Sequence, residues 1–150
     1  MLVEIMRKAA LTICIRAEEL ASRGAPPLEQ LRELIQLELG CVVNERTSDY
    51  HGVLFFEWRE VPKLVKPEFT MLHKRYRRTW RVVLDACVRD GLLRCHPDAA
   101  AHVLHGAIMG SMTWFKSSGR YSLEEYGEIL LGLVQTHNRH LDVLSVASAG

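Results

Sequence analysis

The sequence has no apolar run long enough to cross a membrane. Its apolar stretch nearest the N-terminus, residues 9–15, is seven residues long and is flanked by Lys8 and Arg16. A transmembrane helix needs about 20 apolar residues, and no small-residue cleavage site stands out after this stretch, as a signal peptide would require. We therefore expect a cytoplasmic protein that has no membrane partner.

Closely spaced cysteines are also missing. The four cysteines (Cys14, Cys41, Cys87 and Cys95) are scattered, and none of them forms a CxxC motif. Structural zinc sites and small disulfide frameworks rely on such spacings. The pattern favours reduced thiols, as in a cytosolic protein, and it predicts neither a disulfide framework nor a metal site.

The motifs of the common enzyme classes are absent as well. There is no glycine-rich phosphate loop, no nucleophile elbow and no helical Glu-x-x-His pair. The pairs His102/His105 and His137/His140 have a three-residue spacing that could place each pair near one helix face, but neither has an adjacent carboxylate or thiolate to complete a metal site. We interpret them as interface or surface histidines, and we predict a protein that is not an enzyme and uses no cofactor.

A large excess of positive charge is missing too. The chain has 19 Lys and Arg against 18 Asp and Glu, whereas proteins that neutralise many phosphates are usually more basic. The local exception is HKRYRRTWR at residues 73–81. In a helix, Tyr76 and Trp80 of this stretch would lie on the apolar side, and base stacking needs exposed aromatic rings. We predict a solvated helix face with no direct DNA contact, and a nucleic-acid surface is the alternative.

Helical periodicity, by contrast, runs through every long segment. Apolar residues recur every three or four positions, and proline, glycine and the capping motif SLEE mark the boundaries. The predicted helices cover residues 2–22, 28–42, 67–91, 97–117 and the segment from Ser122 onward. The dense apolar segment 49–58 is predicted to be a short helix, since no second strand-like run could pair with it. We predict an all-α fold of five long helices and one short helix in a single domain, residues 1–150, with a frayed tail at residues 145–150.

The last two predicted helices are apolar on two sides, whereas a surface helix has one polar face. Gly106 and Gly110 lie four residues apart, and each helical glycine costs about 1 kcal/mol relative to alanine, so a groove that admits another helix would explain them. The simplest second burial partner is another copy of the chain, although both helices could instead be central in the monomer. The predicted dimer interface consists of His102, Gly106, Met109, Gly110, Thr113, Trp114, Tyr126, Leu130, Leu133, Val134 and His137.

Four short segments occur in an order and at a spacing typical of one protein family. They are FEWRE, the end of an aromatic-basic helix in RDGLLR, the helix segment GAIMGSMTWF, and GRYSLEEY. With the helices around them, over residues 28–134, they resemble the C-terminal regulatory domain of TetR (tetracycline-repressor) family transcription regulators. The similarity is to the branch that senses fatty acyl, steroid or related lipid-like effectors. One departure is His96, where relatives often have an acidic helix cap.

The resemblance implies a homodimer in which the last two helices of each subunit form a four-helix bundle, and an effector cavity inside the earlier helices. A lipid-like effector needs a mainly apolar cavity with a few polar contacts. Tyr76 and Trp80 could each supply one hydrogen bond, and the flexible Met112 could adapt to the ligand. The residues that the family arrangement would place around the effector are Leu37, Cys41, Leu54, Phe55, Trp58, Tyr76, Trp80, Ile108 and Met112.

The N-terminus departs from the family pattern. Relatives have a three-helix DNA-binding unit there, whereas MLVEIMRKA at residues 1–9 resembles the start of the connecting helix, residues 1–22, that follows this unit. The chain therefore resembles an effector-sensing and dimerisation domain without a helix-turn-helix, either truncated or naturally lacking one. The alternative is a dimerisation module with no small-molecule ligand, in which the aromatic residues only fill the core and which acts by pairing with other proteins.

Overall fold

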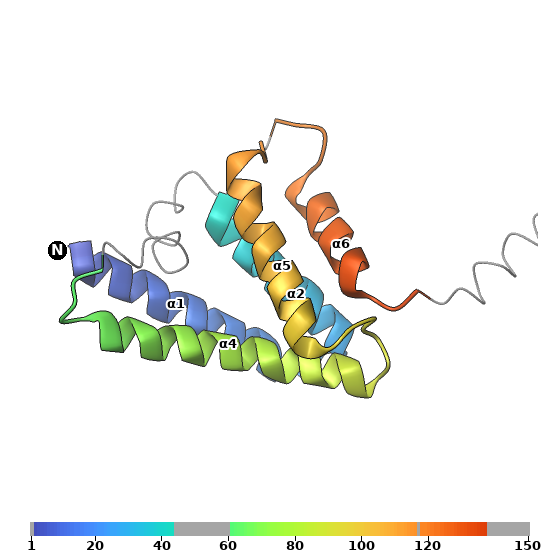
Figure 1. Cartoon of the computed structure of the whole chain (residues 1–150), viewed down its shortest axis with the longest axis horizontal. Helices are drawn as coiled ribbons and strands as arrows, with labels where there is room; N and C mark the ends of the chain where they lie inside the picture. Colours follow the sequence, from blue (N-terminus) through green and yellow to red (C-terminus); the bar gives the residue numbers. More distant parts are fainter. Residues whose placement is uncertain (1, 44–60, 117, 138–150) are drawn as a thin grey trace, which may run out of the picture.

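Five α-helices and one 3₁₀ turn make up the part of the chain that this computed structural model describes, residues 2–43, 61–116 and 118–137 (Figure 1). In chain order they are α1 (Leu2–Ser22), α2 (Pro27–Val43), α4 (Lys66–Arg89), α5 (Pro97–Gly110), the 3₁₀ turn η1 (Ser111–Thr113) and α6 (Leu123–Val134). The predicted all-α class and the five long helices are confirmed. The predicted short helix at residues 49–58 and the predicted frayed tail lie outside the described residues.

The second helix, α2, is at the centre of the arrangement. Figure 1 shows α1 and α4 side by side along the length of the molecule, with α5 and α6 standing across one end, and α2 contacts all four of these helices. Its Leu31, Leu34, Ile35 and Leu39 are fully shielded from solvent. Since burying one such side chain stabilises a fold by about 1.5–3 kcal/mol, α2 supplies much of the driving force for folding.

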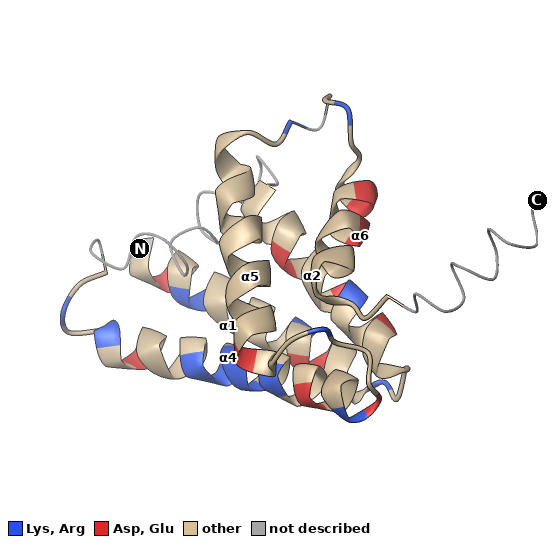
Figure 2. Ribbon diagram, turned by 45° about the vertical axis from the view of Figure 1, so that its right-hand side comes forward, with Lys and Arg blue, Asp and Glu red and all other residues tan. Residues whose placement is uncertain are grey.

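The helix that carries the basic stretch, α4, turns the aromatic rings of that stretch inward. Tyr76 and Trp80 are 3% and 1% exposed, as their spacing predicted. Lys and Arg positions recur along α4, with acidic positions among them (Figure 2), and Arg75 forms an ion pair with Glu18 of α1. The two buried rings cannot stack on nucleic-acid bases. The aromatic contacts expected of a nucleic-acid surface are therefore missing from this stretch of α4.

Helix α5 is shorter than the predicted helix at residues 97–117. Its backbone tightens into η1, where three residues per turn replace 3.6 and later side chains change direction. The buried positions of α5 advance by four residues from Ala100 to Ile108, so Val103 lies beside this stripe and is 45% exposed. Met112 is turned outward by η1 and is equally exposed. Val103 and Met112, although apolar, therefore lie outside the core.

The end of α6 is fixed by backbone pairing with the segment between α4 and α5. Leu93 and Gln135 form an isolated antiparallel bridge, flanked by two backbone hydrogen bonds of 2.8 Å. The helix ends at Val134 because the backbone of Gln135 is extended. His137 was predicted on a face of this helix, but it lies beyond the helix end and is exposed.

One of the two glycines of α6, Gly127, lies against a side chain of α2. A Cβ at Gly127 would lie 2.0 Å from Nε2 of Gln36 on α2, and this amide donates to backbone carbonyls in the first turn of α6. A Cβ at Gly106 or Gly110 on α5 would meet nothing within 4 Å. Packing inside one chain therefore explains the first glycine but not the other two.

The N-terminus of α6 provides a test of local stability. The Ser122 hydroxyl accepts a hydrogen bond of 3.1 Å from the backbone N–H of Glu125, as the capping motif predicts. Because loss of such a cap costs about 1 kcal/mol, Ser122→Ala should lower the free energy of unfolding by that amount in urea denaturation. Ser22→Ala, at the end of α1, is the control and should change it by less than about 0.5 kcal/mol. Equal stability of the two variants would contradict a stabilising cap.

Candidate functional site

The most unusual buried side chain is Glu38, on α2. It is 1% exposed and follows Leu34 by four residues and Ile35 by three, which places it on the apolar side of the helix. Because α2 packs against other helices on several sides, this position faces the interior. A carboxylate that is isolated from water is costly to bury, so it has to receive hydrogen bonds.

Two donors from different helices hold this carboxylate. The Tyr76 hydroxyl of α4 donates to Oε2 of Glu38 at 3.1 Å, and Nδ1 of His105 on α5 lies 2.9 Å from Oε1. An ionised carboxylate only accepts hydrogen bonds, so Nδ1 of the imidazole carries the hydrogen. The three side chains form a network that joins α2, α4 and α5 at one point.

Trp80 helps to orient the imidazole of His105. The two rings meet edge to face with their centroids 4.6 Å apart, and the centroid of the Trp80 ring is 6.4 Å from that of Tyr76. Such contacts favour a defined ring orientation. Since Glu38 engages Nδ1 of His105, Nε2 is the nitrogen that remains for another partner.

A cavity of about 280 Å³ lies beside this network, between α2, α4 and α5. This volume is close to the lower end of the range for small-molecule pockets, about 300–1,000 Å³. Its polar groups come from all three helices, so the cavity depends on their packing. The residues that line it are Glu38, His73, Tyr76, Arg77, His102, His105, Gly106 and Met109.

A second hollow, of about 300 Å³, adjoins the cavity and is called the outer hollow below. It shares Arg77 and His105 with the cavity, and Arg78, Trp80 and Arg81 are also among its lining residues. Three arginines of α4 therefore border this hollow. The arginine that the two spaces share lies where a ligand could contact both.

Burial and the charge of Glu38 shape the ionisation of the surrounding groups. Burial, followed by the Glu38 carboxylate, holds the pKa of Tyr76 well above its ordinary value, so its hydroxyl stays a donor at neutral pH. The same two causes raise the pKa of Cys41 to about 11. Burial and the charge of Arg77 lower the pKa of His73, whose neutral ring accepts a 3.3 Å hydrogen bond from Nε of Arg77 at Nε2.

The predicted effector residues are divided between the core, the surface and the undescribed segment. Five belong to one apolar cluster: Leu37, Cys41, Tyr76, Trp80 and Ile108. Of these, Tyr76 lines the cavity and Trp80 the outer hollow. Met112 is exposed after the end of α5. The remaining three lie outside the described residues: Leu54, Phe55 and Trp58.

Sequence analysis missed the two residues at the centre of this site. Glu38 was not singled out, although an acid within the apolar pattern LIQLELG was a signal. His105 was interpreted as an interface or surface residue, which is wrong because its side chain is only 13% exposed and contacts a buried carboxylate. The interpretation remains a prediction for the exposed His102. Glu38 and His105 are 67 residues apart, so no local pattern could pair them.

The predicted dimer interface contains both exposed and buried side chains. On α5 and just after it, these residues are exposed or half-buried: His102, Gly106, Met109, Gly110, Thr113 and Trp114. On α6, Leu133 is exposed, but Tyr126, Leu130 and Val134 are buried within the same chain. Those three lie on the side of α6 that packs against α2 and α5. For them the structure favours the alternative of a helix side that is central in the monomer.

Nowhere among the described residues do three His, Cys, Asp or Glu side chains converge as ligands for one ion. No described helix combines the length and the apolar character needed to cross a bilayer.

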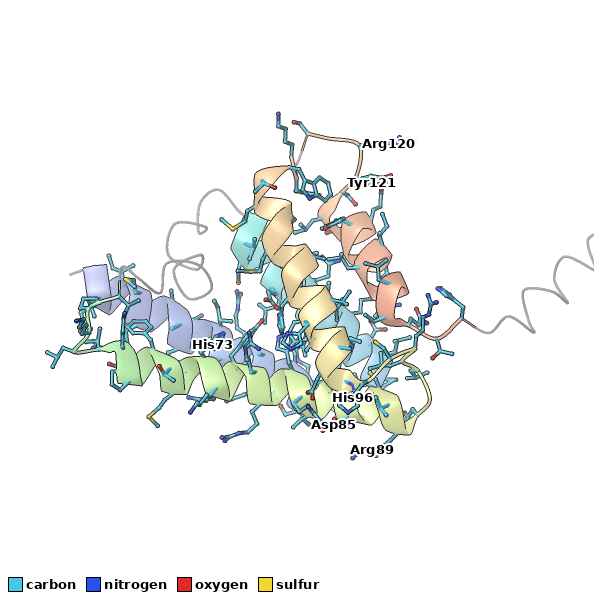
Figure 3. The ribbon with its side chains drawn as sticks, in the orientation of Figure 1. His73, Asp85, Arg89, His96, Arg120 and Tyr121 are labelled. Carbon is cyan, nitrogen blue, oxygen red and sulfur yellow. The ribbon has the colours of Figure 1, made fainter. Side chains whose placement is uncertain are left out.

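The hydrogen bond from Tyr76 can be tested by removing one atom. Tyr76→Phe keeps the ring but leaves the buried Glu38 carboxylate with one donor fewer, which costs about 1–3 kcal/mol. We expect the free energy of unfolding in urea to fall by this amount. Tyr121→Phe is the matched control, because Tyr121 lies in the exposed loop before α6, at the far end of the molecule from His73 (Figure 3). An unchanged stability of Tyr76→Phe would show that Glu38 does not need this donor.

Solved structures with the same fold are found among proteins with different descriptions. The superantigen PfiT is 23% identical, with a TM-score of 0.80 over 91% of this chain and 72% of that one. AibR, in complex with isovaleryl coenzyme A and operator DNA, is 20% identical, with a TM-score of 0.74 over 88% and 71%. FadR from Bacillus subtilis, in complex with stearoyl-CoA, is 18% identical, with a TM-score of 0.64 over 88% and 72%. At these identities the likeness concerns the fold alone.

Sequence comparison defines the family. No curated protein matches the sequence significantly, but residues 24–136 match the family model described as tetracyclin repressor-like, C-terminal domain. This match covers most of the chain and includes every helix of the cavity. The protein therefore belongs to the family of tetracycline-repressor-like C-terminal domains, a non-enzymatic family of regulator domains.

Proposed function

We propose that this chain is the effector-sensing and dimerisation domain of a transcriptional regulator, and that it binds an apolar or lipid-like small molecule in the cavity between α2, α4 and α5. The observation that carries the proposal is the buried network of Glu38, Tyr76 and His105 beside that cavity. Ligand pockets combine apolar walls with a few placed polar groups. The network also holds His105, a lining residue of the cavity, in one orientation.

The ligands named for proteins of the same fold indicate which compounds to test first. AibR was solved with isovaleryl coenzyme A and operator DNA, and FadR with stearoyl-CoA. PfiT is described as a superantigen, which agrees with the rule that one fold supports several functions. Acyl thioesters and related lipids are therefore the first class of effector to examine.

A signal from the cavity would travel through the contact between α4 and α1. Arg75 of α4 pairs with Glu18 of α1, and at the other end of the two helices Phe69 packs with Met6 in a second apolar cluster. A ligand that favours one arrangement of α4 would shift α1 with it, provided that its affinity differs between the arrangements. In a regulator, α1 would transmit this shift to a preceding DNA-binding unit.

The dimerisation part of the proposal rests on the outer surface of the last helices. Trp114, Ile129 and Leu133 are 51%, 45% and 52% exposed, and Gly106 and Gly110 leave open space on α5. Large apolar side chains that share a surface with small residues are typical of a helix–helix contact between chains. Pairing of two copies through α5 and α6 would cover them.

Ligand binding should be visible as thermal stabilisation of the purified chain. We expect at least one of octanoate, octan-1-ol, octanoyl-CoA and a ketosteroid to raise the melting temperature by about 5 °C, since a ligand at one hundred times its Kd adds about 2.7 kcal/mol. Free coenzyme A and buffer are the controls, and native mass spectrometry checks for a molecule that co-purifies. If no compound stabilises the chain and none co-purifies, the dimerisation module without a ligand becomes the better proposal.

The oligomeric state tests the second half of the proposal. Leu133→Arg places a charge on the outer face of α6 and should convert a dimer into a monomer in sedimentation velocity. Val82→Arg is the matched control, because Val82 is similarly exposed, at 58%, but lies on α4, and it should leave the dimer intact. A wild-type chain that sediments as a monomer would contradict the proposed dimer.

A further inference from the structure

The polar groups that border the cavity are mostly cations and ring nitrogens. Among the described residues that line it, Glu38 is the sole acid. Its side chain is fully buried and both of its oxygens take part in hydrogen bonds, so it is not available to a ligand. The groups that remain include Arg77, His102 and His105. A ligand that enters here meets positive charge rather than a free carboxylate.

Among the described residues, Arg77 has no acidic partner, unlike Arg75 and Arg81 on the same helix. Arg75 is paired with Glu18, and Arg81 is paired with two aspartates. Within residues 2–43, 61–116 and 118–137, Arg77 donates to His73 but makes no ion pair. The guanidinium has five N–H donors, so most of them remain for another partner.

Arg77 lies where its remaining N–H donors could bind a ligand. It borders both the cavity and the outer hollow, and Arg78, which also makes no ion pair among the described residues, borders the outer hollow beside it. Guanidinium groups bind carboxylates and phosphates through paired hydrogen bonds. Negative charge at the junction of the two spaces would therefore be neutralised by α4.

We propose that the effector is an anionic amphiphile whose carboxylate or phosphate is bound by Arg77, where the cavity meets the outer hollow, and whose apolar part enters the cavity beside Met109. This inference rests on the function proposed above and specifies the ligand class of that site. A cavity of about 280 Å³ suits an apolar part of short to medium length, because it is near the lower limit for ligand pockets.

Glu38 fixes one wall of the cavity in this arrangement. Its carboxylate holds Nδ1 of His105, and the edge-to-face contact with Trp80 fixes the plane of the imidazole ring. The part of the cavity beside Arg77 is therefore kept in one conformation.

Calorimetric titration of the whole chain with three compounds tests the proposal. Octanoate, octanoyl-CoA and octan-1-ol share an eight-carbon chain and differ in the group at its end. We expect octan-1-ol to bind at least about tenfold more weakly than the better anionic compound, the difference expected for one charge-assisted hydrogen bond. Tighter binding of octanoate would identify a free acid as the ligand, and tighter binding of octanoyl-CoA a thioester with its phosphates; either result supports the proposal.

Variants assign this preference to the named residues. Arg77→Gln should weaken the anionic compounds about tenfold and leave octan-1-ol unchanged, whereas Arg77→Lys, which keeps the charge, should retain part of the preference. Glu38→Gln should weaken all three compounds to a similar degree, because Glu38 shapes the cavity and does not contact the ligand. Arg89→Gln is the control, because Arg89 is exposed near the end of α4, apart from His73 (Figure 3), and lines neither space.

Several outcomes would overturn the proposal. Equal binding of the three compounds, binding of the neutral ketosteroid alone, or an anionic preference that survives Arg77→Gln would each rule out the proposed head-group site but leave the effector-sensing function standing. Absence of binding by these three compounds and by the ketosteroid of the thermal assay would overturn the inference and the ligand-sensing function together.

Discussion

The carboxylate of Glu38 can remain inside the protein only while Tyr76 and His105 donate to it. These donors come from α4 and α5, so the positions of three helices are coupled through one buried side chain. Most of the core could tolerate small shifts, because apolar contacts have no direction. The buried, hydrogen-bonded carboxylate cannot tolerate such shifts. Losing either donor would leave a carboxylate oxygen without a hydrogen bond inside the protein, which costs free energy. The network therefore determines the register in which α2, α4 and α5 pack, and with it the shape of the cavity.

Local patterns predicted the parts of this structure that depend on local forces. The apolar spacing of each helix, the Ser122 cap and the inward rings of Tyr76 and Trp80 follow from residues close together in the chain. The failures have distant causes. The α6 helix ends where Gln135 pairs with Leu93, and α5 gives way to a 3₁₀ turn that exposes Met112. The centre of the candidate site joins positions 67 residues apart, and periodicity contains no information about such a pair.

Gly127 on α6 and the two glycines of α5, Gly106 and Gly110, have different surroundings. Gly127 makes room for Gln36, whose amide bonds to the first turn of α6, so this glycine belongs to the internal contact between α2 and α6. Gly106 and Gly110 face open space, and Gly106 also borders the cavity. One face of α5 thus contributes both to the ligand site and to the surface on which we expect a second copy to pack. The two functions proposed for the domain share a helix.

The bridge between Leu93 and Gln135 has a mechanical consequence. It ties the end of α6 to the segment that links α4 to α5. A rotation of α5 over an occupied cavity would therefore pull on α6 as well. In a symmetric dimer joined through α6, this displacement would be transmitted across the dimer interface. Ligand occupancy of one cavity would then affect the ligand affinity of the other. A brief stretch of main-chain pairing would be enough to make the two sites cooperative.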